Sequence, residues 1–190
     1  MKVLIVAHPD DEIIWFDPLY FNLILITFCE RHDRIRVGRN RLNAILQHPL
    51  KDKICMLNIP ESGFWKNKTK VSEYTKTAEQ LTEMLFQLKN SFQISEIYTH
   101  NSVGEYGHDD HILVHQCVIK VFNGLSNCNI YCPTKYMKED DLRSHQTIKN
   151  KMEINFYNKV KNIYLENNCW TWNLNSEPRA YEEYYQVSSI

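Results

Sequence analysis

Five short apolar runs recur along the chain, and polar, glycine or proline residues separate them. The runs are KVLIVA (2–7), FNLILITF (21–28), KICML (53–57), SEIYTH (95–100) and CNIYC (128–132). Continuous apolar runs of this length are typical of strands that are buried on both faces of a sheet. The pattern therefore predicts five buried β-strands.

Segments with helical periodicity lie between these runs and after the last one. They cover 36–47, 70–90, 111–122 and 142–165. The alternation of strands and helices predicts an α/β fold, namely a Rossmann-like three-layer sandwich with a mostly parallel sheet. We expect a single domain over residues 1–190. Sheets of this kind bind ligands in the crevice beyond the carboxyl ends of their strands.

Composition and charge narrow the classes of partner. The chain has 190 residues with 22 basic and 23 acidic side chains, so it lacks the basic patch of a nucleic-acid-binding protein. No apolar stretch approaches the roughly 20 residues of a membrane span, and the first motif begins too close to Met1 for a signal peptide. We therefore expect a cytoplasmic protein with a small-molecule partner. The six cysteines form no CxxC pair, and we expect free thiols.

Two polar motifs follow predicted strands at the edge of the sheet where ligands bind. The first is AHPDDE (7–12), directly after the first strand. The second, THNSVGEYGHDDHILVH (99–115), leaves the fourth strand, crosses a glycine-containing loop and enters a helix. A helical conformation would place His108, His111 and His115 on one side of that helix.

The residue types in the two motifs are those of a metal site. Imidazole and carboxylate ligands suit zinc or another divalent first-row metal. A catalytic zinc takes three protein ligands and keeps one position for water. The motifs together offer enough such groups, whereas an HxxxH pattern alone would be a weak signal.

These residues resemble the zinc-dependent de-N-acetylases of the PIG-L (LmbE-like) type. Members of that family carry AHPDDE after the first strand and a GHxDH element later, which stand here at 7–12 and 107–111. The segment IPESG (59–63) and the arginine-bearing helix start around 36–41 extend the resemblance over most of the first 122 residues. It implies a hydrolase of linear amides that removes an N-acyl group, usually acetyl, from an amino sugar or its conjugate.

The resemblance also implies a set of ligands and a base. His8, Asp11 and His111 would bind zinc, and Asp10 would be the general base. The chemistry is consistent with these roles, because zinc lowers the pKa of bound water to about 7 and a base must still accept the proton. Asp10 is the sequence neighbour of the ligand Asp11 and would therefore lie within reach of that water.

Three further roles follow from the same resemblance. His108, held by Asp110, would act on the developing oxyanion or on the leaving amine, and Tyr106 would help to polarise the carbonyl. An acid or oxyanion donor of this kind must be protonated near neutral pH. We expect the neighbouring Asp110 carboxylate to raise the pKa of His108 and to fix its tautomer.

Several of these residues also have simple structural interpretations. Asp10 and Asp11 could cap a short helix over 13–16, although this leaves His8 and the second motif unexplained. His115 shares a helix face with apolar residues and is expected in the core rather than among the ligands. We expect Glu12 to cap or support the site and His100 to line the pocket, whereas His32, His48 and His145 take no part. Arg36, Arg39 and Arg41 are expected to be helix-surface charges. The aromatic segments CWTW (169–172) and YEEYYQV (181–187) either stack on a sugar or pack on the core.

Two alternative functions use the same residues. A hydratase or other lyase acting on a small carboxylated substrate would keep the fold and the metal, and several arginines facing the metal would favour it. A metal-binding protein without turnover is the other alternative. Asp10 and His108 argue against it, because a structural zinc is closed by four protein ligands and needs no spare base. The bulky IIWFDPLYF (13–21) replaces the glycine-bearing stretch of many family members, which leaves the shape of the pocket open.

Overall fold

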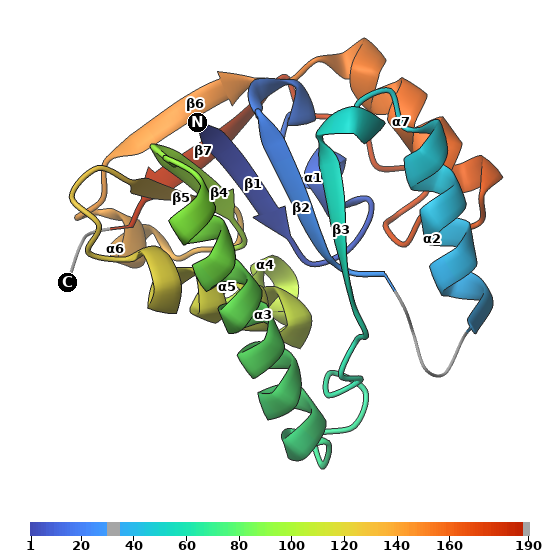
Figure 1. The fold of residues 1–190 in the computed structure, drawn as a ribbon. Helices are drawn as coiled ribbons and strands as arrows, with labels where there is room; N and C mark the ends of the chain where they lie inside the picture. The colour runs from blue at the N-terminus through green and yellow to red at the C-terminus, as the bar shows by residue number, and fades with distance from the viewer. Residues whose placement is uncertain (30–34, 188–190) are drawn as a thin grey trace.

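The computed structural model describes residues 1–29 and 35–187, and the strands in this part of the chain form one mixed sheet of seven (Figure 1). The order across the sheet is β3-β2-β1-β4-β5-β7-β6. Neighbours from β3 to β5 run parallel, whereas β7 is antiparallel to both β5 and β6. The strands are β1 (Lys2–Val6), β2 (Leu23–Phe28), β3 (Ile54–Ile59), β4 (Glu96–Thr99), β5 (Asn129–Pro133), β6 (Thr147–Lys151) and β7 (Tyr181–Gln186).

Helices cover both faces of this sheet. On one face α3 packs against α5, and on the other face α2 and α7 lie side by side (Figure 1). The predicted α/β class, with a mostly parallel sheet between two helical layers, is therefore confirmed. The helices are α1 (Asp11–Ile14), α2 (Ile35–Gln47), α3 (Val71–Ser91), α4 (Gly104–Gly107), α5 (Asp109–Phe122), α6 (Glu139–Leu142) and α7 (Ile154–Glu166), with 3-10 turns at Pro18–Tyr20 and Lys51–Lys53.

The central strand β1 shows why the first apolar run has no polar alternation. Val3 and Ile5 point to the core beneath α3 and α5, whereas Leu4 and Val6 point to the core beneath α2 and α7. All four side chains are fully buried. Because successive strand residues face opposite sides of a sheet, a strand covered on both sides must be apolar at every position.

The C-terminal third departs from the prediction. The segment 142–165 was predicted as one helix, but its first part forms β6 and the helix α7 begins only at Ile154. The aromatic segment that follows supplies β7, which pairs with β6 from Thr147↔Tyr185 to Lys151↔Tyr181. The prediction was wrong because β6, TIKNK, alternates exposed and half-buried residues and becomes a strand only through this long-range pairing.

The sheet register brings the two polar motifs together. Ile5 of β1 is opposite Thr99 of β4, so both strands end at the same edge of the sheet. His8 therefore follows the end of β1 and His100 follows the end of β4. The first turn of α5 lies at the same edge, since His111 is 3.4 Å from Asp11. No helix in the described part of the chain is both long and apolar enough to cross a membrane.

Candidate metal centre

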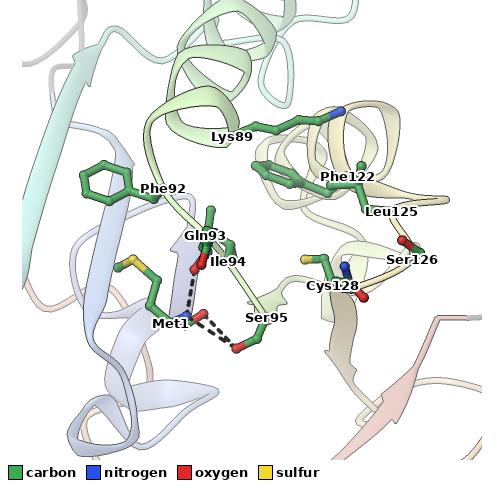
Figure 2. Close-up of a pocket in the computed structure, with 11 residues that line it drawn as sticks. Met1, Lys89, Phe92, Gln93, Ile94, Ser95, Phe122, Leu125, Ser126 and Cys128 are labelled. Atoms are coloured by element: carbon green, nitrogen blue, oxygen red, sulfur yellow. Dashed lines mark hydrogen bonds between the residues drawn. The ribbon is translucent and has the colours of Figure 1, made fainter.

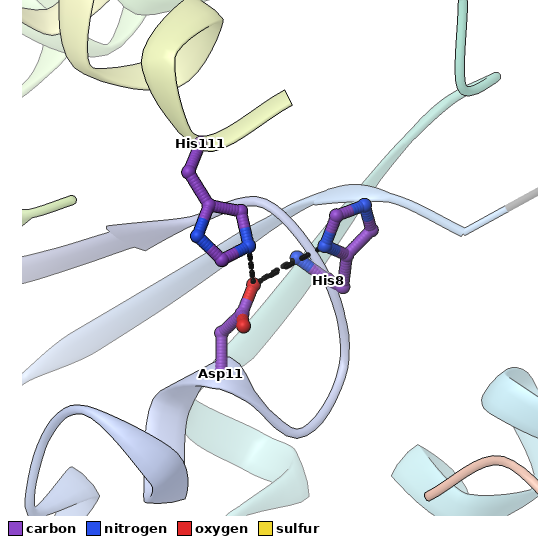
Figure 3. Close-up of side chains that lie close together, drawn as sticks. All are labelled: His8, Asp11 and His111. Atoms are coloured by element: carbon purple, nitrogen blue, oxygen red, sulfur yellow. Dashed lines mark hydrogen bonds and ion pairs between the residues drawn. The ribbon is translucent and has the colours of Figure 1, made fainter. Parts of the chain in front are cut away.

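Three buried side chains converge at the carboxyl edge of β1 (Figure 3). His8 lies in the loop after β1, Asp11 is the first residue of α1, and His111 lies in the first turn of α5. Asp11 Oδ2 is 3.4 Å from His8 Nδ1 and 3.4 Å from His111 Nε2. Their exposed fractions are only 7%, 4% and 1%, respectively. Two imidazoles thus face one carboxylate oxygen.

These separations fit a tetrahedral divalent metal. Zinc bonds of about 2.0–2.1 Å with tetrahedral angles place neighbouring ligand atoms about 3.3–3.4 Å apart. His111 Nε2 is buried and has no hydrogen-bond partner in the described part of the chain, so its lone pair is free for a cation. Asp11 Oδ1 accepts the Trp15 indole N–H at 3.2 Å, and Oδ2, which accepts the His8 backbone N–H at 2.8 Å, is the oxygen that faces both imidazoles. His8, Asp11 and His111 could therefore hold a divalent metal ion.

Each imidazole is oriented by a second carboxylate on its other nitrogen. His111 Nδ1 is 2.6 Å from Glu105 Oε2, and His8 Nε2 is 3.3 Å from Asp110 Oδ2. Ring N–H donation to these carboxylates leaves His111 Nε2 and His8 Nδ1 to face Asp11. Carboxylate partners of this kind fix the tautomer of metal-binding histidines and increase their basicity.

The electrostatics around His8 favour a positive charge. Burial lowers the pKa of His8, but the hydrogen bonds with Asp11 and Asp110 and the charge of Glu61 outweigh it and raise the pKa to about 10. The carboxylates around His8 thus favour a cation at this position. A divalent metal would replace the proton on Nδ1, because metal ligands bind in their deprotonated form.

Asp10 has the environment of a base. Its Oδ2 accepts hydrogen bonds from the Thr171 amide at 2.8 Å and the Thr171 hydroxyl at 2.7 Å, and its own N–H donates to Glu12 Oε2 at 2.9 Å. The other oxygen, Oδ1, is buried without a hydrogen-bond partner in the described residues. Burial, followed by the charge of Asp11, raises the pKa of Asp10 to about 7. One oxygen is thus anchored and the other is free to accept a proton.

The expected pairing of His108 with the Asp110 carboxylate is wrong. His108 is the N-cap of α5, and its Nδ1 accepts the Asp110 backbone N–H at 3.2 Å, while the Asp110 carboxylate turns to His8. Burial, followed by the charges of His8 and His111, lowers the pKa of His108 to about 3. The ring is therefore neutral at pH 7 with its proton on Nε2. The expected increase in the pKa of His108 is wrong, because burial and the charges of His8 and His111 lower this pKa more than the charge of Asp110 raises it.

Aromatic side chains surround His108 at the surface. The ring of Trp65 lies 5.3 Å from that of His108, and Tyr106 lies 5.8 Å from it on a T-shaped contact. Trp172 packs 5.1 Å from Tyr106 and 5.2 Å from Trp15. Tyr106 is 49% exposed and Trp65 37%. The CWTW segment therefore contributes to the rim of the site, whereas Tyr184 and Tyr185 of the last aromatic segment are buried in the core.

The remaining sequence expectations have mixed outcomes. His115 is buried and its Nδ1 donates to the His100 carbonyl, which places it outside the centre. Arg36 and Arg39 are exposed as expected, but Arg41 is buried and forms a 2.6 Å ion pair with Glu61, so its interpretation as a surface charge was wrong. His48 and His145 are not among the three converging ligands. All six cysteines are free thiols. His32 lies outside the described residues.

Four residues of the site were not predicted from the sequence. Glu105, Glu61, Trp15 and Thr171 contact the ligands or the base directly. Glu61 belongs to IPESG, and Trp15 follows Asp11 by one helical turn, so both carried a weak signal. Thr171 carried none, because it is 161 residues from Asp10.

A separate cavity opens at the opposite, amino-terminal edge of the sheet (Figure 2). It has a volume of about 540 Å³ and lies between the carboxyl ends of α3 and α5, with Phe92 and Phe122 on its walls. Its lining contains one thiol, Cys128, and no histidine, aspartate or glutamate. The cavity has no imidazole or carboxylate side chain for a metal, whereas such groups converge at the carboxyl edge, which is therefore the candidate metal site.

No model of a known protein family matches the chain, and no curated protein sequence matches it.

Proposed function

We propose that this protein is a zinc-dependent hydrolase that removes an N-acyl group, most simply acetyl, from an amino sugar or its conjugate. The family of the PIG-L (LmbE-like) de-N-acetylases, which the motifs resemble, is part of this proposal. The observation that carries it is the convergence of His8, Asp11 and His111, together with Asp10, which precedes Asp11 in the chain and has an unpartnered Oδ1 among the described residues. An open three-ligand centre with an adjacent base is the arrangement of a hydrolytic metal site rather than of a structural one.

The residues of the chain would divide the work as follows. Zinc, held by His8, Asp11 and His111, supplies a Lewis acid that polarises the amide carbonyl and makes water more acidic. Asp10 accepts a proton from the attacking water through Oδ1. His108, as a neutral N–H donor, stabilises the negative charge that develops on the carbonyl oxygen. Asp10 then delivers its proton to the amine nitrogen as the carbon–nitrogen bond breaks, so that water and amide become carboxylic acid and amine.

The rim supports a sugar as the group that carries the amide. Exposed Trp65 and Tyr106 stand beside His108, and flat aromatic faces bury the apolar side of a ring while polar groups stay hydrated. Among the residues that the structure describes, nothing gives the lyase alternative such support. It called for several arginines facing the metal, but Arg36 and Arg39 are exposed on α2 and Arg41 is paired with Glu61.

The decisive experiment is a screen of N-acylated amino sugars with mass detection of the products. We expect loss of the acyl mass only with zinc-loaded protein, loss of activity with a chelator, and recovery when zinc is restored. Zinc binding without conversion of any acylated amine would contradict the enzyme assignment. Absence of zinc binding would contradict the metal centre itself.

A further inference from the structure

Glu105 lies behind the metal centre and is almost completely enclosed. Only 2% of the residue is exposed, and its carboxylate faces three N–H donors. Oε2 is 2.6 Å from His111 Nδ1 and 3.0 Å from His100 Nδ1, while Oε1 accepts the Asn101 backbone N–H at 3.1 Å. An ionised carboxylate can accept all three hydrogen bonds, since it presents acceptors only.

The hydrogen bonds of His100 determine where its proton lies. His100 Nε2 is 2.9 Å from the Ala7 backbone N–H, which can only donate. Nε2 must therefore be an acceptor, and the ring proton is on Nδ1, where it is donated to Glu105. Burial lowers the pKa of His100, but the carboxylates of Glu105 and Asp11 outweigh this effect and raise the pKa to about 9. A second proton, on Nε2, would break the hydrogen bond with the Ala7 N–H. His100 thus links Glu105 to the end of β1.

The backbone at Glu105 is held in an unfavourable conformation. Its φ of 52° and ψ of −87° lie near those of a strained γ-turn, which residues with a side chain rarely adopt. Asn101 holds the turn, because its side-chain oxygen accepts the Glu105 N–H at 2.9 Å and its amide donates to the Pro133 and Lys135 carbonyls. The chain thus maintains a costly conformation at the residue whose carboxylate reaches His111.

A second metal ion between these groups is a weaker interpretation. His100, Glu105 and His111 are close enough together for a metal-binding set. However, separations of 2.6 and 3.0 Å between ring nitrogen and carboxylate oxygen are those of N–H···O hydrogen bonds with a proton between the atoms. Ligands of one zinc ion would stand about 3.3 Å apart.

We propose that Glu105, anchored by His100, is a positioning residue that holds His111 in the Nδ1–H tautomer and aims its Nε2 at the metal. This inference rests on the proposed zinc centre. The ring of His100 also stacks on that of His111, with centroids 3.8 Å apart and planes at 19°, so rotation of the His111 ring is restricted as well. The ligand is therefore oriented before the metal arrives, which favours tight binding.

Zinc affinity of two Glu105 variants tests this proposal in the full chain, by competition with a fluorescent chelator. Glu105→Gln keeps the size of the side chain, but its NH2 group must face either the two imidazole N–H groups or the Asn101 N–H, so a donor opposes a donor in both orientations. Glu105→Gly removes the carboxylate and relieves the positive φ. Asn58→Gly is the matched control, because it relieves another positive φ, 53°, at an exposed residue of β3. We expect both Glu105 variants to raise the zinc Kd by about 10- to 100-fold and the control to leave it unchanged.

A second readout needs no metal. Long-range proton–nitrogen NMR of the imidazoles should show His111 protonated at Nδ1 in the natural chain, and this signature should be lost in Glu105→Gly, which has no acceptor for that proton. If Glu105→Gly does not fold, the Gln variant and this spectrum decide the question. An unchanged zinc Kd in folded Glu105 variants, or protonation of His111 at Nε2 in the natural chain, would overturn the positioning role while leaving the proposed hydrolase intact. A natural chain that binds no zinc would overturn both.

Discussion

Substitution of Asp10 by asparagine separates the base from the metal ligands. In the structure only Oδ2 of Asp10 is hydrogen-bonded, and both of its partners, the Thr171 amide and hydroxyl, are donors. The carbonyl oxygen of asparagine can accept the same two hydrogen bonds, so its amide nitrogen takes the place of Oδ1. The variant therefore retains the anchoring of residue 10 and loses only the oxygen that accepts a proton.

The expected magnitudes follow from that exchange. Loss of a general base lowers kcat by about 10²- to 10⁴-fold, which raises the activation barrier by about 3–5 kcal/mol. Stability should not fall, because burial of a neutral amide costs less than burial of a carboxylate. Zinc stoichiometry should be unchanged, since Asp10 is not one of the three converging ligands.

The assay is release of free amine from the N-acetylated amino sugar that the screen identifies, measured together with zinc content and thermal unfolding. Thr171→Val is the matched control, because it removes the hydroxyl hydrogen bond to Asp10 but keeps the carboxylate and the backbone N–H bond. We expect a much smaller decrease in kcat for this control. Near-normal turnover of Asp10→Asn with full zinc occupancy would refute the role of Asp10 as the base.

Three further predictions concern the metal, the support of Asp10 and the dependence of stability on pH. His111→Ala should lower zinc occupancy by elemental analysis and abolish chelator-sensitive activity; full occupancy would remove His111 from the ligand set. Tyr164→Phe deletes the 2.6 Å hydrogen bond to the buried Glu12 carboxylate and should lower the free energy of unfolding in urea by about 1–3 kcal/mol, whereas an unchanged value would show that this hydrogen bond is not stabilising. Burial lowers the pKa of His48 from 6.5 to about 4, so His48 becomes protonated at a higher pH in the unfolded chain than in the folded chain. Stability is therefore lost as the pH falls from about 6.5 to 4. His48→Gln should reduce that loss of unfolding free energy by about 3 kcal/mol in unfolding curves between pH 7 and 4. An identical pH dependence in the variant and the natural chain would contradict the lowered pKa of His48.

The sequence by itself determined the sheet from β1 to β5 and the region where the site lies. β1, β2 and β4 are buried between helices on both faces, so each is an unbroken apolar run that can be recognised locally. The edge strand β3 was expected to be buried but is mostly half-buried, with Cys55 exposed, because it has a neighbour on one side only. The carboxyl ends of parallel strands share one edge, which placed AHPDDE beside the start of α5. His8 and Asp10 lie in the loop after β1 and Asp11 begins α1, while His108 and His111 lie at the start of α5, so local spacing brought the residues of each motif near each other.

Only the tertiary structure decided which strands complete the sheet and which polar groups pair. β6 and β7 pair across the 29 residues that separate Lys151 from Tyr181, and neither has enough apolar residues to be recognised alone. Asp110 is two residues from His108, yet its carboxylate contacts His8, 102 residues away. Hydrogen bonds and pKa values depend on distance, direction and burial, and these are set by segments that fold together rather than by neighbours in sequence. The positions of Glu105 and Thr171 around the metal centre follow from that same physical cause.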